Sequence, residues 1–141
     1  MIDPDDAIEF ADNAWVKAGY DLRALQPALQ VVQLINWLNF ETILGGVYGW
    51  LINKGYYGPD TARALETVGA HQCAAIVREI LAFFPESTPT TNDRERVQQM
   101  EDIGEAGETS WRELGNRLLT WPDDIYALLE KFIAEHEADF T

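Results

Sequence analysis

The chain has one cysteine, few basic residues and no long apolar run, and each shortage excludes a class of protein. Cys73 is the only cysteine in 141 residues, which excludes an internal disulfide and a cysteine-rich metal site. It lies in the apolar run 73–77, so we expect a buried, unreactive thiol. No apolar stretch reaches the roughly 20 residues that span a bilayer, and the chain begins with acidic rather than basic residues. We therefore expect a cytoplasmic protein.

Basic residues are scarce relative to acidic ones. The chain holds 24 acids and 10 bases, which gives a net charge of −14. Residues 1–53 hold seven acids and two bases, residues 54–85 hold three of each, and residues 86–141 hold fourteen acids and five bases. Such a surface repels nucleic acid and anionic membranes and attracts basic proteins. The composition therefore favours a protein partner over direct nucleic-acid or membrane binding.

Apolar residues recur at helical spacing, and no alternating strand pair with a hairpin turn is present. With 47% hydrophobic residues, residues 1–141 should fold as a single domain. The periodicity predicts an all-α, single-domain bundle of about seven helices. The short segment 47–52 fits a helix or a strand, and we interpret it as a short helix. The expected long helices span residues 4–18, 27–44, 58–68, 70–84, 93–103, 111–119 and 123–137.

Several residues predict where these helices begin and end. Asp3 before Pro4 is a strong helix start. The pair Gly45-Gly46 should break the second helix, and Gly69 should separate two others. Ser110 and Glu113 match a capping box, so a helix is expected to restart near Trp111. Residues 86–92 have the composition of a loop.

Catalytic and metal-binding patterns are weak. His71 and His136 are far apart in sequence and neither has metal-ligand spacing. The Gly45-Gly46 pair lacks the rest of a phosphate-binding loop, and Asp123-Asp124 are explained as first-turn acids of a helix. We therefore expect no catalytic residue, metal or cofactor. An enzyme that uses acids around the Gly45-Gly46 turn is the least favoured alternative.

The acids themselves are the candidate binding residues. Carboxylates three or four residues apart on a helix lie about 5 to 6 Å apart, so a row of them approximates the spacing of DNA phosphates. Glu101, Glu105 and Glu108 have this spacing if one helix persists through the intervening glycines, Gly104 and Gly107. The predicted partner-binding acids are Asp5, Glu9 and Asp12 in the first helix, and Glu95, Glu101, Asp102, Glu105, Glu108 and Glu113 near the carboxyl end.

The stretch 41–77 carries a motif that resembles a bacterial family of small, acidic, all-helical proteins known through a DNA-mimic member. A helix that ends at Phe84-Pro85 and a carboxyl-terminal helix with His136 and Phe140 extend the resemblance to most of the chain from about residue 30. The chain departs from the motif at Leu44, Val47 and Gly49, where the family has asparagine, phenylalanine and glutamine. The matching motif residues are Glu41, Gly45, Gly46, Trp50, Leu51, Asn53 and the run 65–70, which includes Gly69.

The resemblance implies a non-catalytic protein whose acidic surface occupies the DNA-binding face of a basic transcription regulator or nucleoid protein. The alternative is that the chain is an immunity or antidote protein. In that case its acidic surface would bind and neutralise a basic toxin. That alternative requires a specific apolar hot spot, which charge mimicry does not. Pairing with a second copy of the chain is left open.

Overall fold

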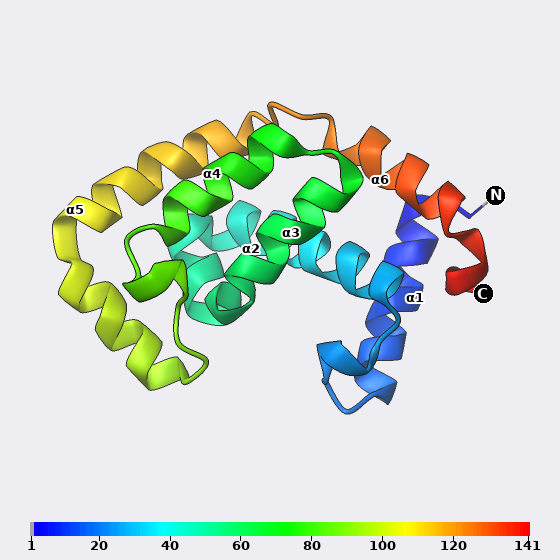
Figure 1. The fold of residues 1–141 in the computed structure, drawn as a ribbon, viewed down its shortest axis with the longest axis horizontal. Coiled ribbons are helices and arrows are strands. Elements are labelled where there is room, and N and C mark those ends of the chain that lie inside the picture. The colour runs from blue at the N-terminus through cyan, green and yellow to red at the C-terminus, as the bar shows by residue number, and fades with distance from the viewer. Residues whose placement is uncertain (1) are drawn as a thin grey trace.

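The computed structural model describes residues 2–141, which form six α-helices and four short 3-10 helices and contain no strand. The prediction of an all-α fold is confirmed. The central helix α2 has α3 and α4 packed beside it, while α1 and α6 lie at one end of the molecule and α5 curves around the other (Figure 1). The α-helices are α1 (Pro4–Lys17), α2 (Pro27–Lys54), α3 (Gly58–Val68), α4 (His71–Leu81), α5 (Asp93–Leu119) and α6 (Ile125–Glu135). The 3-10 helices are Leu22–Ala24, Gly55–Tyr57, Pro85–Ser87 and Glu137–Phe140.

Two long helices are bent at glycines that leave helical geometry. Gly46 (φ 67°, ψ −174°) divides α2 into arms over residues 27–45 and 47–54. Gly104 (φ 71°, ψ −149°) divides α5 into arms over residues 93–103 and 105–119. A positive φ is readily adopted only by glycine. The predicted break at Gly45-Gly46 is thus confirmed, and the segment 47–52 is helical as interpreted.

The predicted helix restart near Trp111 is wrong. Ser110 and Glu113 lie inside α5, which already resumes after Gly104. The residue that caps the start of α5 is Asn92, whose Oδ1 accepts the Glu95 N–H at 2.9 Å. Gly107 stays helical because its missing side chain leaves room for Ile103 and the Trp111 ring.

Side-chain carboxylates accept hydrogen bonds at the starts of three other helices, α1, α4 and α6. The Asp3 carboxylate accepts the Asp5 N–H at 2.8 Å, which confirms the predicted start of α1. Asp124 caps α6 by accepting the Ala127 N–H at 3.1 Å. Its neighbour Asp123 instead accepts the Cys73 N–H at the start of α4, at 2.8 Å. Two adjacent acids therefore fix two different helices, and Gly69 (φ 90°) ends α3 as predicted.

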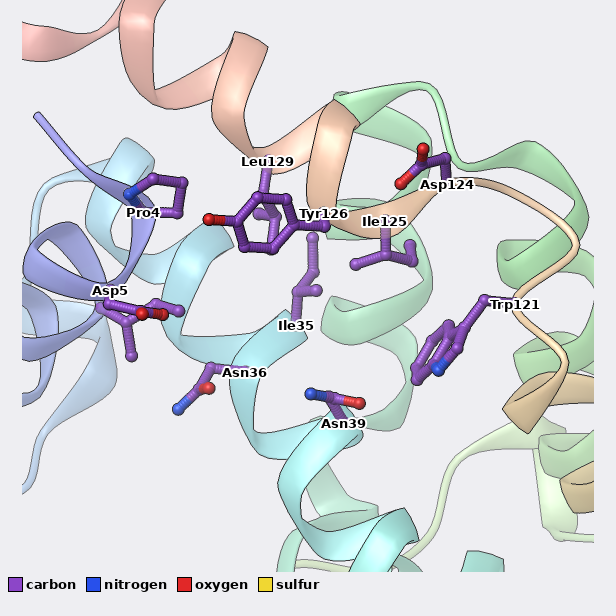
Figure 2. Close-up of a pocket in the computed structure, with 11 residues that line it drawn as sticks. Pro4, Asp5, Ile35, Asn36, Asn39, Trp121, Asp124, Ile125, Tyr126 and Leu129 are labelled. Carbon is purple, nitrogen blue, oxygen red and sulfur yellow. The ribbon is translucent and has the colours of Figure 1, made fainter. Parts of the chain in front are cut away.

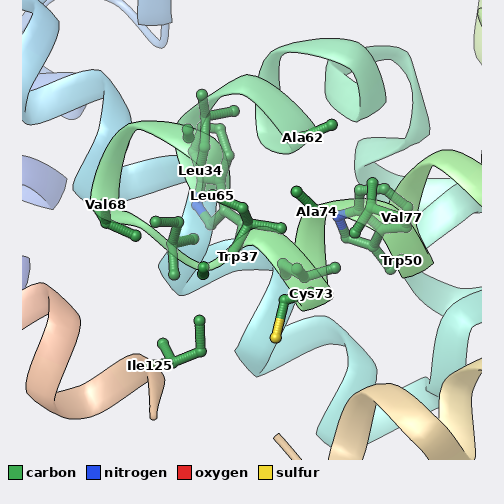
Figure 3. Packing of buried hydrophobic residues seen from close by; sticks show 14 of the residues in the cluster. Leu34, Trp37, Trp50, Ala62, Leu65, Val68, Cys73, Ala74, Val77 and Ile125 are labelled. Atoms are coloured by element: carbon green, nitrogen blue, oxygen red, sulfur yellow. The ribbon is translucent and has the colours of Figure 1, made fainter. Parts of the chain in front are cut away.

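The core lies where α2, α3, α4 and α5 meet. Figure 3 shows Trp37 and Trp50 of α2 packed among side chains of α3 and α4. Trp111 of α5 is buried as well, and its indole N–H donates to the Ile80 carbonyl at 3.0 Å. Cys73 is fully buried, and burial raises the pKa of its thiol to about 11. The prediction of a buried cysteine is confirmed.

Candidate partner-binding surface

All nine predicted partner-binding acids are exposed, but they lie at two separate places. Asp5, Glu9 and Asp12 form a row on α1, and the other six lie on α5. α1 and α5 occupy opposite ends of the long axis of the molecule (Figure 1). The fold therefore presents two acidic surfaces and does not join them into one.

The larger concentration of charge surrounds the glycine bend of α5. We call Glu101, Asp102, Glu105 and Glu108 the acidic bend; all four are exposed, and residues 97–111 include no base. Among residues 2–141, the nearest basic partner of these carboxylates is Arg112, 4.0 Å from Glu108. The other three have no ion pair within this part of the chain. An exposed pair at 4.0 Å contributes little, so the bend keeps its negative charge.

The bend changes the expected geometry of the acids. The row Glu101, Glu105 and Glu108 required one continuous helix, but Gly104 interrupts α5 between the first two. Regular spacing survives only between Glu105 and Glu108 in the second arm. The acids instead lie on both sides of the bend at Gly104, two in each arm, and all four are exposed. Glu95 and Glu113 lie farther along the two arms.

Asp12 of the α1 row also has a structural contact. Its carboxylate accepts a hydrogen bond at 3.0 Å from the amide of Gln33, which is fully buried. The neighbouring Lys54 ammonium lies over the rings of Trp37 and Trp15, at 4.4 and 5.3 Å from their centroids. Burial lowers the pKa of Lys54, and the carboxylates of Glu41, Asp12 and Asp93 partly offset this effect. Part of the α1 charge therefore serves the fold.

The residues of the family motif form a clamp across the bend of α2. Glu41, before the bend, accepts a hydrogen bond at 2.9 Å from Asn53, after it. Gly46 makes the bend, the adjacent Gly45 stays helical, and Trp50 is fully buried in the second arm. Two of the positions at which the chain differs from the family motif have different surroundings. Val47 is buried next to Gly115, whereas Leu44 is 70% exposed.

The buried Arg96 was not predicted as an important residue. Its Nε donates to the Leu51 carbonyl at 2.8 Å, and its Nη2 donates to the Ile52 carbonyl. Its Nη1 donates to the Thr90 carbonyl at 2.9 Å, and its Nη2 also donates to the Asp93 carboxylate at 2.6 Å. Arg96 thereby joins the end of α2 to the loop before α5. Gly55 lies next to the Arg96 stem, but no pattern in the sequence links these two distant positions.

The turn at Gly45-Gly46 does not gather carboxylates around a cavity. The hollow beside it measures about 210 Å³, and Glu108 is its only acidic lining residue. His71 contacts Glu66 on the surface, while His136 packs on the Phe132 ring. Among residues 2–141, no three histidine, cysteine or acidic side chains are grouped to hold a metal ion. In the described residues, the hollow beside this turn is therefore lined by one carboxylate and one arginine, Arg112.

The model of one protein family, described as DMP19-like protein, matches residues 23–136. The chain belongs to the DMP19-like family. No curated protein and no solved structure matches it. The part shared with the DMP19-like family contains the clamp of α2, Arg96 and the whole of α5, but not the acidic row on α1. None of the helices in residues 2–141 of this DMP19-like chain is long and apolar enough to cross a membrane.

Proposed function

We propose that this DMP19-like chain is a non-catalytic protein-binding domain that imitates DNA. The acidic bend would occupy the DNA-binding surface of a basic transcription regulator or nucleoid protein. The observation that carries the proposal is the concentration of four exposed carboxylates at one corner, with no base in residues 97–111. The family name is consistent with this function.

The placement of two of these acids supports a role beyond folding. Glu101 and Asp102 lie in the last turn of the first arm of α5, where the helix dipole disfavours negative charge. No basic side chain in residues 2–141 pairs with either of them, and Asp102 accepts only a hydrogen bond from Gln98 at 2.9 Å. Helix stability alone would favour lysine or arginine here. Binding of a basic partner gives a reason for the acids.

The test begins with an affinity pull-down from a native lysate, eluted by a salt step and followed by identification of the eluted protein. Because paired charges and released counterions dominate such contacts, we expect the affinity to fall at least about tenfold between low and moderate salt. A DNA duplex bound by the partner should compete with the chain. A tight complex that ignores salt or tolerates DNA would contradict the proposal.

Matched charge variants locate the surface. One variant carries E101Q, D102N, E105Q and E108Q, and should lose most of its affinity. The control carries D6N, E86Q, E130Q and E135Q, which remove the same charge from exposed positions elsewhere. Equal losses in both variants would mean that net charge, rather than the acidic bend, attracts the partner.

An antidote that neutralises a basic toxin is the second candidate, and one observation favours it. Phe40, Ile43 and Leu44 are 57%, 61% and 70% exposed. They lie three and four residues apart, so they form one apolar stripe on α2. Such a stripe can act as a binding hot spot. In that case F40A would abolish binding, while the variant of the acidic bend would retain it.

A further inference from the structure

The apolar groove between α1, α2 and α6 has the lining of a binding site. Its volume is about 550 Å³, which is within the range of sites for small groups and side chains. Pro4, Ile8, Ile35, Ile125 and Leu129 make its walls apolar. Figure 2 shows the Tyr126 and Trp121 rings at different places along the groove, together with Asn36 and Asn39 of α2.

The polar groups of this groove can receive a planar cation. Asn36 and Asn39 line it, and neither side chain has a hydrogen-bond partner in residues 2–141. Either amide can turn its carbonyl oxygen toward a donor. The two aromatic rings offer faces on which a flat cation stacks. No lysine or arginine lines the groove, so no resident cation fills this place.

Negative charge surrounds the opening. Asp5 and Asp124 line the groove, and the Asp124 carboxylate also caps α6. Partial desolvation raises the pKa of Tyr126, and the carboxylates of Asp3, Asp5 and Glu130 raise it further. A cation at this position would meet several carboxylates and no opposing base.

The backbone at Trp121 is held in an unfavourable conformation that places its ring in this groove. Its φ is 48°, in the left-handed region that bulky residues rarely adopt. Glycine or asparagine commonly takes this position after a helix. Strained residues of this kind concentrate at binding sites.

We propose that this groove binds the guanidinium group of an arginine on the basic protein partner. The inference rests on the proposed function, which supplies that partner, but the groove is distinct from the acidic bend. A guanidinium fits better than an ammonium because it is planar, stacks on rings and donates to two amide oxygens at once. The apolar walls would receive the methylene stem of the arginine.

The first experiment titrates the protein with benzamidine, a planar amidinium on an apolar ring, and with benzamide, its neutral isostere. NMR signals of the Trp121 indole and the Asn36 and Asn39 amides should shift and saturate. Benzamidine should bind at least tenfold more tightly than benzamide. Equal binding of both probes, or benzamidine shifts spread evenly over the acidic bend, would overturn the inference.

Substitutions provide a matched control. D5N should weaken benzamidine binding several-fold, whereas D6N, which removes the same charge from the same helix turn outside the groove, should change it less than twofold. N36L with N39L should remove the preference for benzamidine over benzamide. The thermal unfolding midpoint of each variant establishes that it is folded. Equal effects of D5N and D6N would overturn the inference, because they would show that benzamidine is attracted by the overall charge and not by this groove.

A second arm tests whether the cation is carried by a protein. An alanine-rich helical peptide with one central arginine should displace benzamidine, and the same peptide with citrulline should not. If the arginine peptide fails to displace benzamidine, the assignment to a protein side chain is overturned. Neither arm needs the natural partner. The groove proposal can therefore be overturned while the salt-sensitive complex at the acidic bend is still found, and the groove can bind benzamidine while no such complex is found.

Discussion

At the scale of single residues, Arg96 connects two parts of the chain that are distant in sequence. Its guanidinium is fully buried, satisfies carbonyl oxygens at the end of α2 and lies 5.0 Å from the centroid of the Tyr56 ring. The groups that balance its positive charge are the backbone carbonyls that accept its hydrogen bonds and the Asp93 carboxylate. Sequence patterns could not reveal this role, because an arginine in the first turn of a charged helix usually faces solvent.

We expect R96M to lower the free energy of unfolding by about 2–4 kcal/mol, because it removes the hydrogen bonds that Arg96 donates to the carbonyls of Leu51, Ile52 and Thr90. Methionine keeps much of the side-chain volume, so the loss reports on hydrogen bonding. R94M, at the exposed neighbouring position, should change stability by less than about 0.5 kcal/mol. Urea unfolding followed by tryptophan fluorescence measures both variants, and similar losses would contradict the role of Arg96.

Cys73 should make stability depend on alkaline pH. Its pKa is raised from 9.0 to about 11 by burial. Between pH 9 and 11 the unfolded chain loses the thiol proton while the native chain keeps it, so the free energy of unfolding falls as the pH rises. C73A lacks this effect, and its stability deficit relative to the wild type should narrow from pH 8 to pH 11. Urea titrations at several pH values test this, and rapid thiol labelling of the native protein at pH 8 would contradict the burial.

At the scale of helices, the two adjacent glycines of α2 have different roles. Gly45 is helical, and nothing lies within 4 Å of an added Cβ, so G45A should stabilise the protein by up to about 1 kcal/mol. Gly46 has equal space but a φ of 67°, so G46A should destabilise it by about 1–3 kcal/mol. Thermal unfolding of the two variants makes this comparison. Equal effects would show that α2 straightens at little cost.

The sequence predicted that the elements are helices and where most of them begin or end, because those features depend on local signals, such as Asp3 before Pro4 at a start and Gly69 after Val68 at an end. It did not predict that α5 resumes directly after Gly104. Gly104 and Gly107 look alike in sequence, yet only Gly104 leaves helical geometry, whereas Gly107 packs against the Trp111 ring. Tertiary packing decided between them, and it also decided that Asp123 caps α4 rather than its own helix.

At the scale of the whole molecule, the sequence predicted the amount of charge but not its distribution. Every predicted partner-binding acid is exposed, as expected for charged residues, yet α1 and α5 lie at opposite ends (Figure 1). The groove at the α1 end combines residues 4 to 129, so no local motif could have indicated it. The proposed basic partner would therefore meet negative charge at both ends of a molecule whose net charge is −14.

This charge should reduce stability most where it opposes the helix dipole. E101Q with D102N removes two acids from the end of the first arm of α5, and should raise the free energy of unfolding by about 0.5–1 kcal/mol at low salt. E105Q with E108Q makes the same change in net charge at the start of the second arm, where the dipole favours acids, so it should produce no such gain. The difference should shrink in 1 M NaCl because salt screens exposed charges. Urea unfolding at both salt concentrations measures it, and equal gains from both pairs would mean that overall repulsion, rather than the position of these acids in the bend, sets their cost.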